Sequence, residues 1–280
     1  MITNTSKIAV LIDGDNAEAY LIDEILNEAS KVGRVTVKRI YADWTKHEMN
    51  KWKEQLNKYA IRPVQKFSYT KGKNSTDSAL IVDAMDIMHA KVVEGFCIVS
   101  SDSDYTGLAH RIREEGLFVM GIGRSQTPEA FVKACENFIY TEILIPQKET
   151  VVHKTHERHA PVKKEKKTVA ADKVEKPEEP HKEIRKVNLS GGLRSRITNK
   201  PLDPELIDKA FDVAVNNLTG LALASLLGGA LRKIDPTFDP RNYGHTSFRK
   251  FLEALKPRYE LVVHDDNMTI SLRRKEGETT

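Results

Sequence analysis

The 280-residue sequence has few of the features that mark disulfide-stapled, membrane-spanning or nucleotide-binding proteins. Its two cysteines, Cys97 and Cys135, offer neither a disulfide framework nor the spacing of a zinc site. The sequence contains no apolar run of about 18 residues and no basic-then-apolar signal segment, so we expect no membrane contact and a reducing, cytoplasmic setting. Neither a G-x-G-x-x-G pattern nor a P-loop is present, which excludes the commonest nucleotide-phosphate motifs.

A strong overall charge is also missing, because the net charge is only +4. The excess is concentrated in residues 147–200, which hold 15 basic and 8 acidic residues. Lysine and glutamate are the commonest residues of this segment and aromatic residues are absent from it, so it cannot bury a core. We therefore expect three parts: a domain at 1–146, a charged disordered linker at 147–200 and a second domain at 201–280.

Two apolar runs in the first part each end in aspartates. Residues 7–12 lead into Asp13, and residues 96–99 lead through two serines to Asp102 and Asp104. Continuous apolar runs of this length are typical of strands buried on both faces of a parallel sheet. Such sheets carry their chemistry beyond the carboxyl ends of the strands, so we expect these aspartates at one edge. The alternative is that they only cap the helices that follow.

A third acidic position is Asp77, at the start of an expected helix. Three elements would thus direct a carboxylate to the same edge, where like charges repel unless a cation compensates them. Carboxylates without histidine or cysteine suit Mg²⁺ or Mn²⁺ and disfavour zinc. One or two such ions can support phosphodiester hydrolysis. The metal ligands predicted on this basis are Asp13, Asp77, Asp102 and Asp104.

Strand and helix patterns alternate along this part, which predicts a three-layer α/β domain with a mainly parallel sheet. Expected strands cover 7–13, 34–42, 61–64, 96–99, 117–122 and 138–144. Expected helices cover 17–30, 46–59 and 128–136. Another begins near Asp77 and runs through Met88, and one that includes Leu108, Ala109 and Ile112 ends at Glu115. Lys71 and Lys73, in the polar loop before Asp77, are expected to contact phosphate groups of a substrate.

The second domain begins with three amphipathic patterns, at 206–218, 223–234 and 248–255. Two short strands at 261–263 and 268–272 then read as a hairpin. Three helices followed by a hairpin predict a small winged-helix-like α+β domain, whose third helix would expose Arg249 and Lys250 for phosphate contacts. An ordinary solvated helix face or a protein-docking module are the alternatives.

Three motifs of the first domain resemble those of NYN domains, in the LabA-like branch of the PIN-like nuclease superfamily. They are Ile12-Asp13-Gly14-Asp15-Asn16, Lys71-Gly72-Lys73-Asn74-Ser75-Thr76-Asp77 and Ser100-Ser101-Asp102-Ser103-Asp104-Tyr105. The resemblance covers about residues 5–145 and implies metal-dependent ribonuclease chemistry. It puts Asp13, Asn16, Asp77, Asp102 and Asp104 at catalytic positions. Relatives commonly have glycine at the position of Ser101.

The second domain resembles the OST-HTH/LOTUS family. The resemblance is carried by Phe238-Asp239-Pro240-Arg241-Asn242-Tyr243-Gly244 and by Ser247-Phe248-Arg249-Lys250-Phe251-Leu252. That family is associated with RNA binding, and in some members with protein partners. The resemblance implies RNA contacts by Arg241, Arg249 and Lys250.

The leading interpretation is a Mg²⁺- or Mn²⁺-dependent endoribonuclease with a tethered RNA-binding module. An RNA-binding regulator with a vestigial nuclease site is the main alternative. A phosphatase of the HAD type is a third reading, since Asp13-Gly14-Asp15 matches its Asp-x-Asp, but Ala17 stands where that family has Thr or Val. Asp83 is turned about 240° from Asp77 around a helix, so we expect it to pack rather than to share the ion. The sequence leaves the RNA target and the oligomeric state open.

Overall fold

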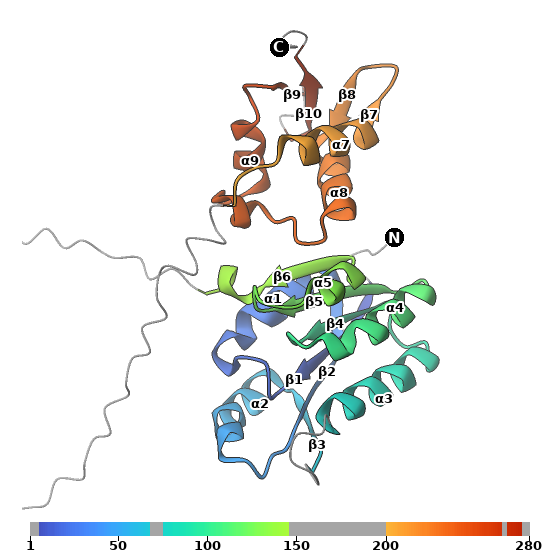
Figure 1. Cartoon of the computed structure of the whole chain (residues 1–280), viewed down its shortest axis with the longest axis vertical. Helices are drawn as coiled ribbons and strands as arrows, with labels where there is room; N and C mark the ends of the chain where they lie inside the picture. The colour runs from blue at the N-terminus through green and yellow to red at the C-terminus, as the bar shows by residue number, and fades with distance from the viewer. Residues whose placement is uncertain (1–5, 68–74, 146–199, 265–267, 276–280) are drawn as a thin grey trace, which may run out of the picture. The chain divides into compact units, whose positions relative to one another are not determined.

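A computed structural model describes residues 6–67, 75–145, 200–264 and 268–275 (Figure 1). Lys71 and Lys73 lie outside the described residues, and so does the expected linker up to residue 199.

The N-terminal part is built on a six-stranded sheet in which all neighbouring strands are parallel. Its strands are β1 (Lys7–Asp13), β2 (Arg34–Ala42), β3 (Arg62–Gln65), β4 (Gly95–Val99), β5 (Phe118–Gly123) and β6 (Asn137–Tyr140). Their order across the sheet is β3-β2-β1-β4-β5-β6. The prediction of a mainly parallel α/β sheet is thereby confirmed.

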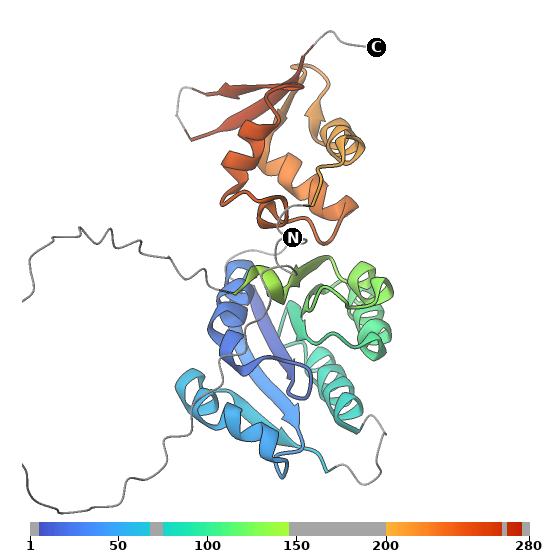
Figure 2. The same cartoon turned by 60° about the vertical axis from the view of Figure 1, so that its left-hand side comes forward.

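Helices cover both faces of this sheet (Figure 2). The α-helices are α1 (Ile22–Val32), α2 (Lys53–Tyr59), α3 (Ser75–His89), α4 (Thr106–Glu114) and α5 (Glu129–Ala134). Short 3-10 helices are η1 (Ala19–Leu21), η2 (His47–Trp52), η3 (Ser103–Tyr105) and η4 (Thr141–Ile143). Helices α1 and α2 lie on one face, and α3, α4 and α5 lie on the other, which gives the three layers that the alternating pattern predicts.

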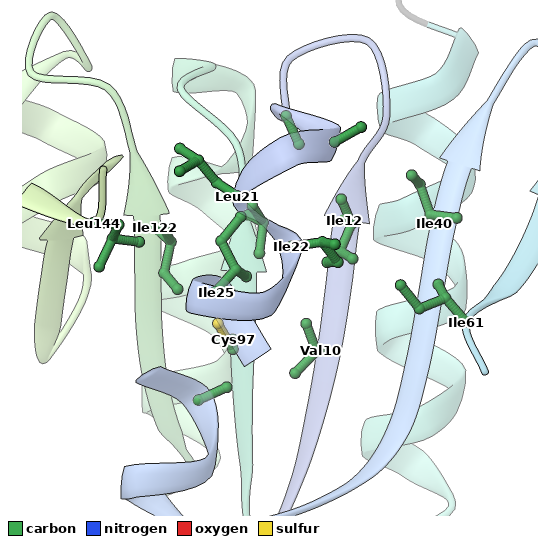
Figure 3. Close-up of a cluster of buried hydrophobic side chains, with 14 of the residues drawn as sticks. Val10, Ile12, Leu21, Ile22, Ile25, Ile40, Ile61, Cys97, Ile122 and Leu144 are labelled. Atoms are coloured by element: carbon green, nitrogen blue, oxygen red, sulfur yellow. The ribbon is translucent and has the colours of Figure 1, made fainter. Parts of the chain in front are cut away.

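Alternation along the central strands divides the core into two clusters. In β1, Val10 and Ile12 face α1, whereas Ala9 and Leu11 face α3 and α4. Figure 3 shows the α1 side, where side chains of β1, β2, β4 and β5 lie beside those of η1 and α1. Each fully buried Leu or Ile side chain contributes about 1.5–3 kcal/mol of hydrophobic free energy. The two central strands are therefore firmly held, and their carboxyl ends are fixed in space.

The strand order reverses between β1 and β4. From β1 the chain proceeds to β2 and β3 on one side, and it then crosses to β4 on the other side of β1. The two strands are in parallel register, with Ile12 opposite Val99. Asp13 and Ser100, the next residues of the two segments, therefore lie beside each other at the carboxyl edge. Open α/β sheets bind their ligands at such a switch point.

Some expected boundaries in this part differ from the observed ones. The strand expected over 138–144 ends at Tyr140, and η4 follows it. The helix expected over 17–30 begins as η1 and continues as α1 to Val32. The helix expected over 46–59 likewise consists of η2 followed by α2. These differences leave the positions of the aspartates unchanged.

The C-terminal part combines three α-helices with a small antiparallel sheet. Its elements are α7 (Pro204–Ala214), β7 (Val215–Asn216), β8 (Leu221–Leu223), α8 (Ala224–Ile234), η5 (Pro240–Tyr243), α9 (Phe248–Ala254), β9 (Tyr259–Val263) and β10 (Ile270–Arg274). The strand order is β7-β8-β10-β9. This agrees with the predicted winged-helix-like α+β domain, with β9 and β10 as the expected hairpin.

The prediction of a helix over 206–218 is wrong at its C-terminal end. It stops at Ala214, and Leu218, expected on its apolar face, is 96 % exposed in the turn between β7 and β8. The cause is turn chemistry: the Asn216 side chain accepts a hydrogen bond from the Leu218 backbone, and Gly220 adopts φ of +65°. These local preferences override the helical spacing of apolar residues. Strand β7 forms where the pattern predicts helix, and β8 takes up Leu223, the first residue of the next expected helix.

Within the described residues, no helix is both long enough and apolar enough to cross a membrane.

Candidate functional site

Three of the predicted carboxylates meet at the carboxyl edge of the sheet. One oxygen each from Asp77, Asp102 and Asp104 lie within 4.8 Å of one another. Asp77 is only 9 % exposed, Asp102 is half-buried and Asp104 is exposed, so the group opens to solvent on one side. We refer to these three residues as the acidic cluster.

Local backbone structure fixes where the cluster's side chains point. Asp102 is the N-cap of η3, and its Oδ1 accepts a hydrogen bond from the Asp104 backbone N–H at 3.0 Å. This capping contact makes the short turn that brings the two aspartates to the same side. Asp77 arrives from a different direction, in the first turn of α3. The cluster therefore depends on the packing of α3 against the β4–α4 connection.

Asp13 is fully buried beneath the edge and is held by three donors. Its Oδ2 accepts hydrogen bonds from the Asn16 side-chain amide at 2.7 Å and from the Ser100 hydroxyl at 2.9 Å. Its Oδ1 accepts one from the backbone of Asp15 at 3.2 Å. Asp13 does not belong to the group of oxygens within 4.8 Å. Its role as a metal ligand stays a prediction.

Two serines link the first and third motifs to their neighbours. The Ser100 hydroxyl donates to Asp13 and accepts from the Asp102 backbone N–H at 3.1 Å, so it joins the end of β1 to the acidic cluster. The Ser101 hydroxyl accepts from the Arg124 backbone N–H at 2.8 Å, which joins β4 to the end of β5. The hydroxyl of Ser101, where relatives have glycine, thus makes a specific contact in this chain.

The electrostatic environment disfavours negative charge on two of the carboxylates. Burial raises the pKa of Asp13 above its usual 3.8, although hydrogen bonds from Asn16 and Ser100 oppose the shift. Burial also raises the pKa of Asp77, and the negative charges of Asp13, Asp102 and Asp104 add to this effect. A cation at the cluster would relieve both the repulsion and the pKa shift of Asp77.

Tyr105 donates its hydroxyl hydrogen to Oδ1 of Asp77 at 2.7 Å. The side chain is fully buried, and burial together with the nearby Asp13 and Asp77 raises the pKa of Tyr105. The hydroxyl therefore stays protonated and acts as a donor. Tyr105 closes η3, directly after Asp104, so the third motif contacts the second through this bond.

The remaining acidic residues of the motifs have other partners. Asp83 pairs with the guanidinium of Arg39 and accepts a hydrogen bond from the Tyr41 hydroxyl. This agrees with the expectation that Asp83 packs rather than shares the site of Asp77. Asp15 forms an ion pair with Lys46 at 3.3 Å.

Sequence reasoning assigned no role to Ser100 or Tyr105, although both belong to the quoted motif. A signal for Ser100 was present: parallel β1 and β4 with equivalent ends place the residue after Val99 beside Asp13. No comparable signal exists for Tyr105, because its contact with Asp77 depends on how α3 packs. From the spacing of apolar residues alone, Tyr105 is predicted only to lie in the hydrophobic core.

In the C-terminal part, Arg249 and Lys250 are exposed on α9, whose N-cap is Ser247. Arg249 also pairs with Glu253 at 3.7 Å. Arg241 is different, because its Nε and Nη2 contact both carboxylate oxygens of Asp239 at 2.9 and 2.8 Å. Burial would raise the pKa of Asp239, but the hydrogen bonds and charge of Arg241 outweigh it and hold the pKa below 3.8. RNA binding by these three basic residues stays a prediction.

Comparison with known proteins identifies both domains. The NYN domain model matches residues 7–144, and the OST-HTH/LOTUS domain model matches residues 209–271. None of the curated proteins matches the sequence. Among solved structures, a protein of unknown function from Vibrio parahaemolyticus is similar at 19 % identity, with a TM-score of 0.41, over 49 % of this chain and 94 % of that chain.

The two families indicate a general activity. NYN domains are PIN-like nucleases, a class that generally uses divalent metals, and OST-HTH/LOTUS domains are associated with RNA. The acidic cluster lies within the matched NYN residues. The chain carries an NYN domain of the PIN-like nuclease kind, followed by an OST-HTH/LOTUS domain.

Proposed function

We propose that this protein is a Mg²⁺- or Mn²⁺-dependent endoribonuclease that hydrolyses RNA phosphodiester bonds. The observation that carries the proposal is the convergence of Asp77, Asp102 and Asp104 within 4.8 Å, from two separate segments of the chain. Helix caps alone would not require Asp77, which belongs to another helix, to face the other two. The proposal extends the general nuclease character of NYN domains to a metal, a substrate and a set of residues.

The donor set fits a hard divalent cation. It consists of carboxylate oxygens, without histidine or cysteine, and its exposed side leaves room for the waters that Mg²⁺ retains. Asp77, Asp102 and Asp104 would hold the ion. When bound, such an ion supplies positive charge that stabilises the charge developing on phosphate oxygens during hydrolysis.

Asp13 and Asn16 complete the proposed catalytic set. Asp13 is buried below the cluster, and its negative charge contributes to the raised pKa of Asp77. Asn16 and Ser100 hold the Asp13 carboxylate in one orientation by donating to its Oδ2. These contacts pre-arrange the carboxylate before substrate arrives, and such preorganisation lowers the cost of reaching the transition state.

We further propose a division of labour between the domains at 1–146 and 201–280. The OST-HTH/LOTUS domain would bind RNA through Arg249 and Lys250, and a protein partner of that domain is the alternative outcome.

We also propose a cytoplasmic location, because both cysteines are buried free thiols, as is usual in a reducing compartment.

The test is the variant Asp102→Asn in the full-length protein. We expect loss of Mg²⁺-dependent cleavage of single-stranded RNA without a fall in the melting temperature, because the half-buried Asp102 serves the ion more than the core. Undiminished cleavage would refute the assignment of Asp102. RNA binding by the wild type without any cleavage in Mg²⁺ or Mn²⁺ would favour a regulator, and phosphate release from small monoesters would favour a phosphatase.

A further inference from the structure

Two buried tyrosine hydroxyls donate to two aspartates of the same helix. Tyr105 donates to Asp77, and Tyr41 donates to Asp83, six residues further along α3. Both tyrosine side chains are fully buried. The two contacts are chemically alike, but only Asp77 belongs to the acidic cluster. The chain thus provides a natural comparison between a contact that ties α3 to the fold and one that also reaches the site.

We propose that Tyr105 is a positioning residue, whose hydroxyl holds the Asp77 carboxylate in the orientation that the metal site requires. This inference rests on the proposed function, because it assumes that Asp77 binds the ion. The hydroxyl lies at 2.7 Å from Oδ1 and so restricts rotation of the carboxylate about its own axis.

The carboxylates of the acidic cluster repel one another, and the Tyr105 hydroxyl opposes the movement that this repulsion favours. With one oxygen of each aspartate within 4.8 Å, Asp102 and Asp104 push the Asp77 carboxylate away from them. Rotation about the side-chain bonds of Asp77 would relieve this repulsion and open the cluster before an ion arrives. The Tyr105 hydroxyl, which donates to Oδ1 of Asp77, opposes that rotation.

The ring that carries the hydroxyl is itself held in place. Its centroid lies 6.3 Å from that of Phe131, which packs edge-on against Phe138 at 5.8 Å. Phe131 and Phe138 are almost completely buried. Because the ring is packed on this side, the hydroxyl has little freedom to follow a rotating carboxylate. Replacing tyrosine by phenylalanine would keep this packing and remove only the donor.

Two effects of the hydrogen bond on ion binding oppose each other. Donation draws charge from Asp77 and on its own weakens the attraction for a cation, whereas fixed orientation strengthens binding. Loss of the groups that orient metal ligands typically lowers metal affinity by about 10–100-fold, so orientation is expected to dominate. We therefore expect the hydroxyl to tighten ion binding.

The experiment compares Tyr105→Phe with Tyr41→Phe in the full-length protein, by calorimetric titration with Mn²⁺. Tyr105→Phe should raise the Mn²⁺ dissociation constant about 10-fold. Tyr41→Phe should leave it within about 2-fold of wild type, since Asp83 is not part of the cluster. Unchanged or tighter binding by Tyr105→Phe would overturn the proposal. Equal losses in both variants would also overturn it, because the tyrosines would then act only by fastening α3.

A second measurement separates positioning from lost stability. The Mn²⁺-induced rise in melting temperature is recorded for each variant against its own metal-free value. A variant that is merely less stable starts lower but keeps the full rise, whereas impaired positioning reduces the rise itself.

The wild-type protein reports separately on the proposed function. If wild type binds Mn²⁺ and cleaves RNA while Tyr105→Phe binds normally, only the positioning role fails. If wild type binds no Mn²⁺, both the proposed function and the positioning role fail.

Discussion

Replacing Asp77 by asparagine should make the metal-free protein more stable. Its carboxylate has two negative neighbours, Asp102 and Asp104, with one oxygen of each within 4.8 Å. At that distance, two unit charges repel by about 1 kcal/mol in bulk water and by about 3.5 kcal/mol at an effective dielectric constant of 20. Because Asp104 is exposed, the lower figure is the better guide for its pair. Asp77→Asn removes the repulsion with both Asp102 and Asp104, and this increases the free energy of unfolding by a few kcal/mol at most.

Two effects reduce the gain. Wild-type protein can bind a proton at Asp77 and so escape part of the repulsion. The asparagine would also accept a weaker hydrogen bond from Tyr105 than a carboxylate does, by about 1 kcal/mol. We expect a net increase of about 1–2 kcal/mol in the free energy of unfolding at neutral pH, which corresponds to a rise of about 3–6 °C in melting temperature.

The pH dependence has a definite sign. The pKa of Asp77 is raised in the folded protein above its value of 3.8, mainly by burial and also by neighbouring negative charge. Between the unfolded and folded pKa values, the folded state binds more protons, so this group's contribution to stability falls as pH rises from 3.8 through the folded pKa. Asp77→Asn should remove this decline, and its advantage over wild type should therefore grow with pH across that window.

The assay is thermal and urea unfolding in EDTA, with Asp83→Asn as the matched control. Asp83 lies on the same helix but pairs with Arg39 and accepts from Tyr41, so the same substitution there should destabilise the protein by about 1–3 kcal/mol. Opposite signs for the two variants are the expected result. Destabilisation by Asp77→Asn in EDTA would refute the reasoning that the cluster is held together against its own charge.

Two further predictions concern RNA. Changing Lys71 and Lys73 together to alanine should weaken RNA binding and reduce the slope of log affinity against log salt by about 1.4, or about 0.7 for each lost phosphate contact on a single strand; an unchanged slope in filter-binding titrations would mean that neither lysine contacts phosphate. Cleaving the chain within 160–180 should leave the rate on saturating RNA unchanged but lower it at low RNA concentration, because tethering raises the effective concentration of RNA near the nuclease. A mixture of the two halves that matches the intact chain at low substrate would contradict the tethering role.

Much of the N-terminal fold could be predicted because its sequence signals are local and agree with one another. The apolar run before Asp13 is buried along its length, as a central parallel strand requires. Strand β2 covers the same residues, 34–42, that its alternating pattern predicts. Once two parallel strands end in acidic residues, the meeting of Asp13 with the segment before Asp102 follows from sheet geometry.

The relations inside the site could not be predicted in the same way. Asp13 was expected beside Asp77, Asp102 and Asp104 as an equivalent ligand, yet it lies buried, held by Asn16. Asp13 is the last residue of β1, and its depth depends on the elements that pack around the end of that strand, which a periodic pattern does not encode. In the C-terminal part, the spacing of apolar residues predicts a helix to residue 218, but the turn formed by Asn216 and Gly220 ends the helix at Ala214.

Helix α3 illustrates why residue type alone does not assign a role. Asp77 and Asp83 are chemically identical and both accept from a buried tyrosine. What separates them is the charge of their other neighbours, since Asp83 has the cation of Arg39 whereas Asp77 has two more carboxylates. The negative charge of Asp83 is balanced within the protein by the guanidinium of Arg39. At Asp77, three carboxylates lie together, and a bound cation would balance their charge; this difference is why we propose the metal at Asp77 and not at Asp83.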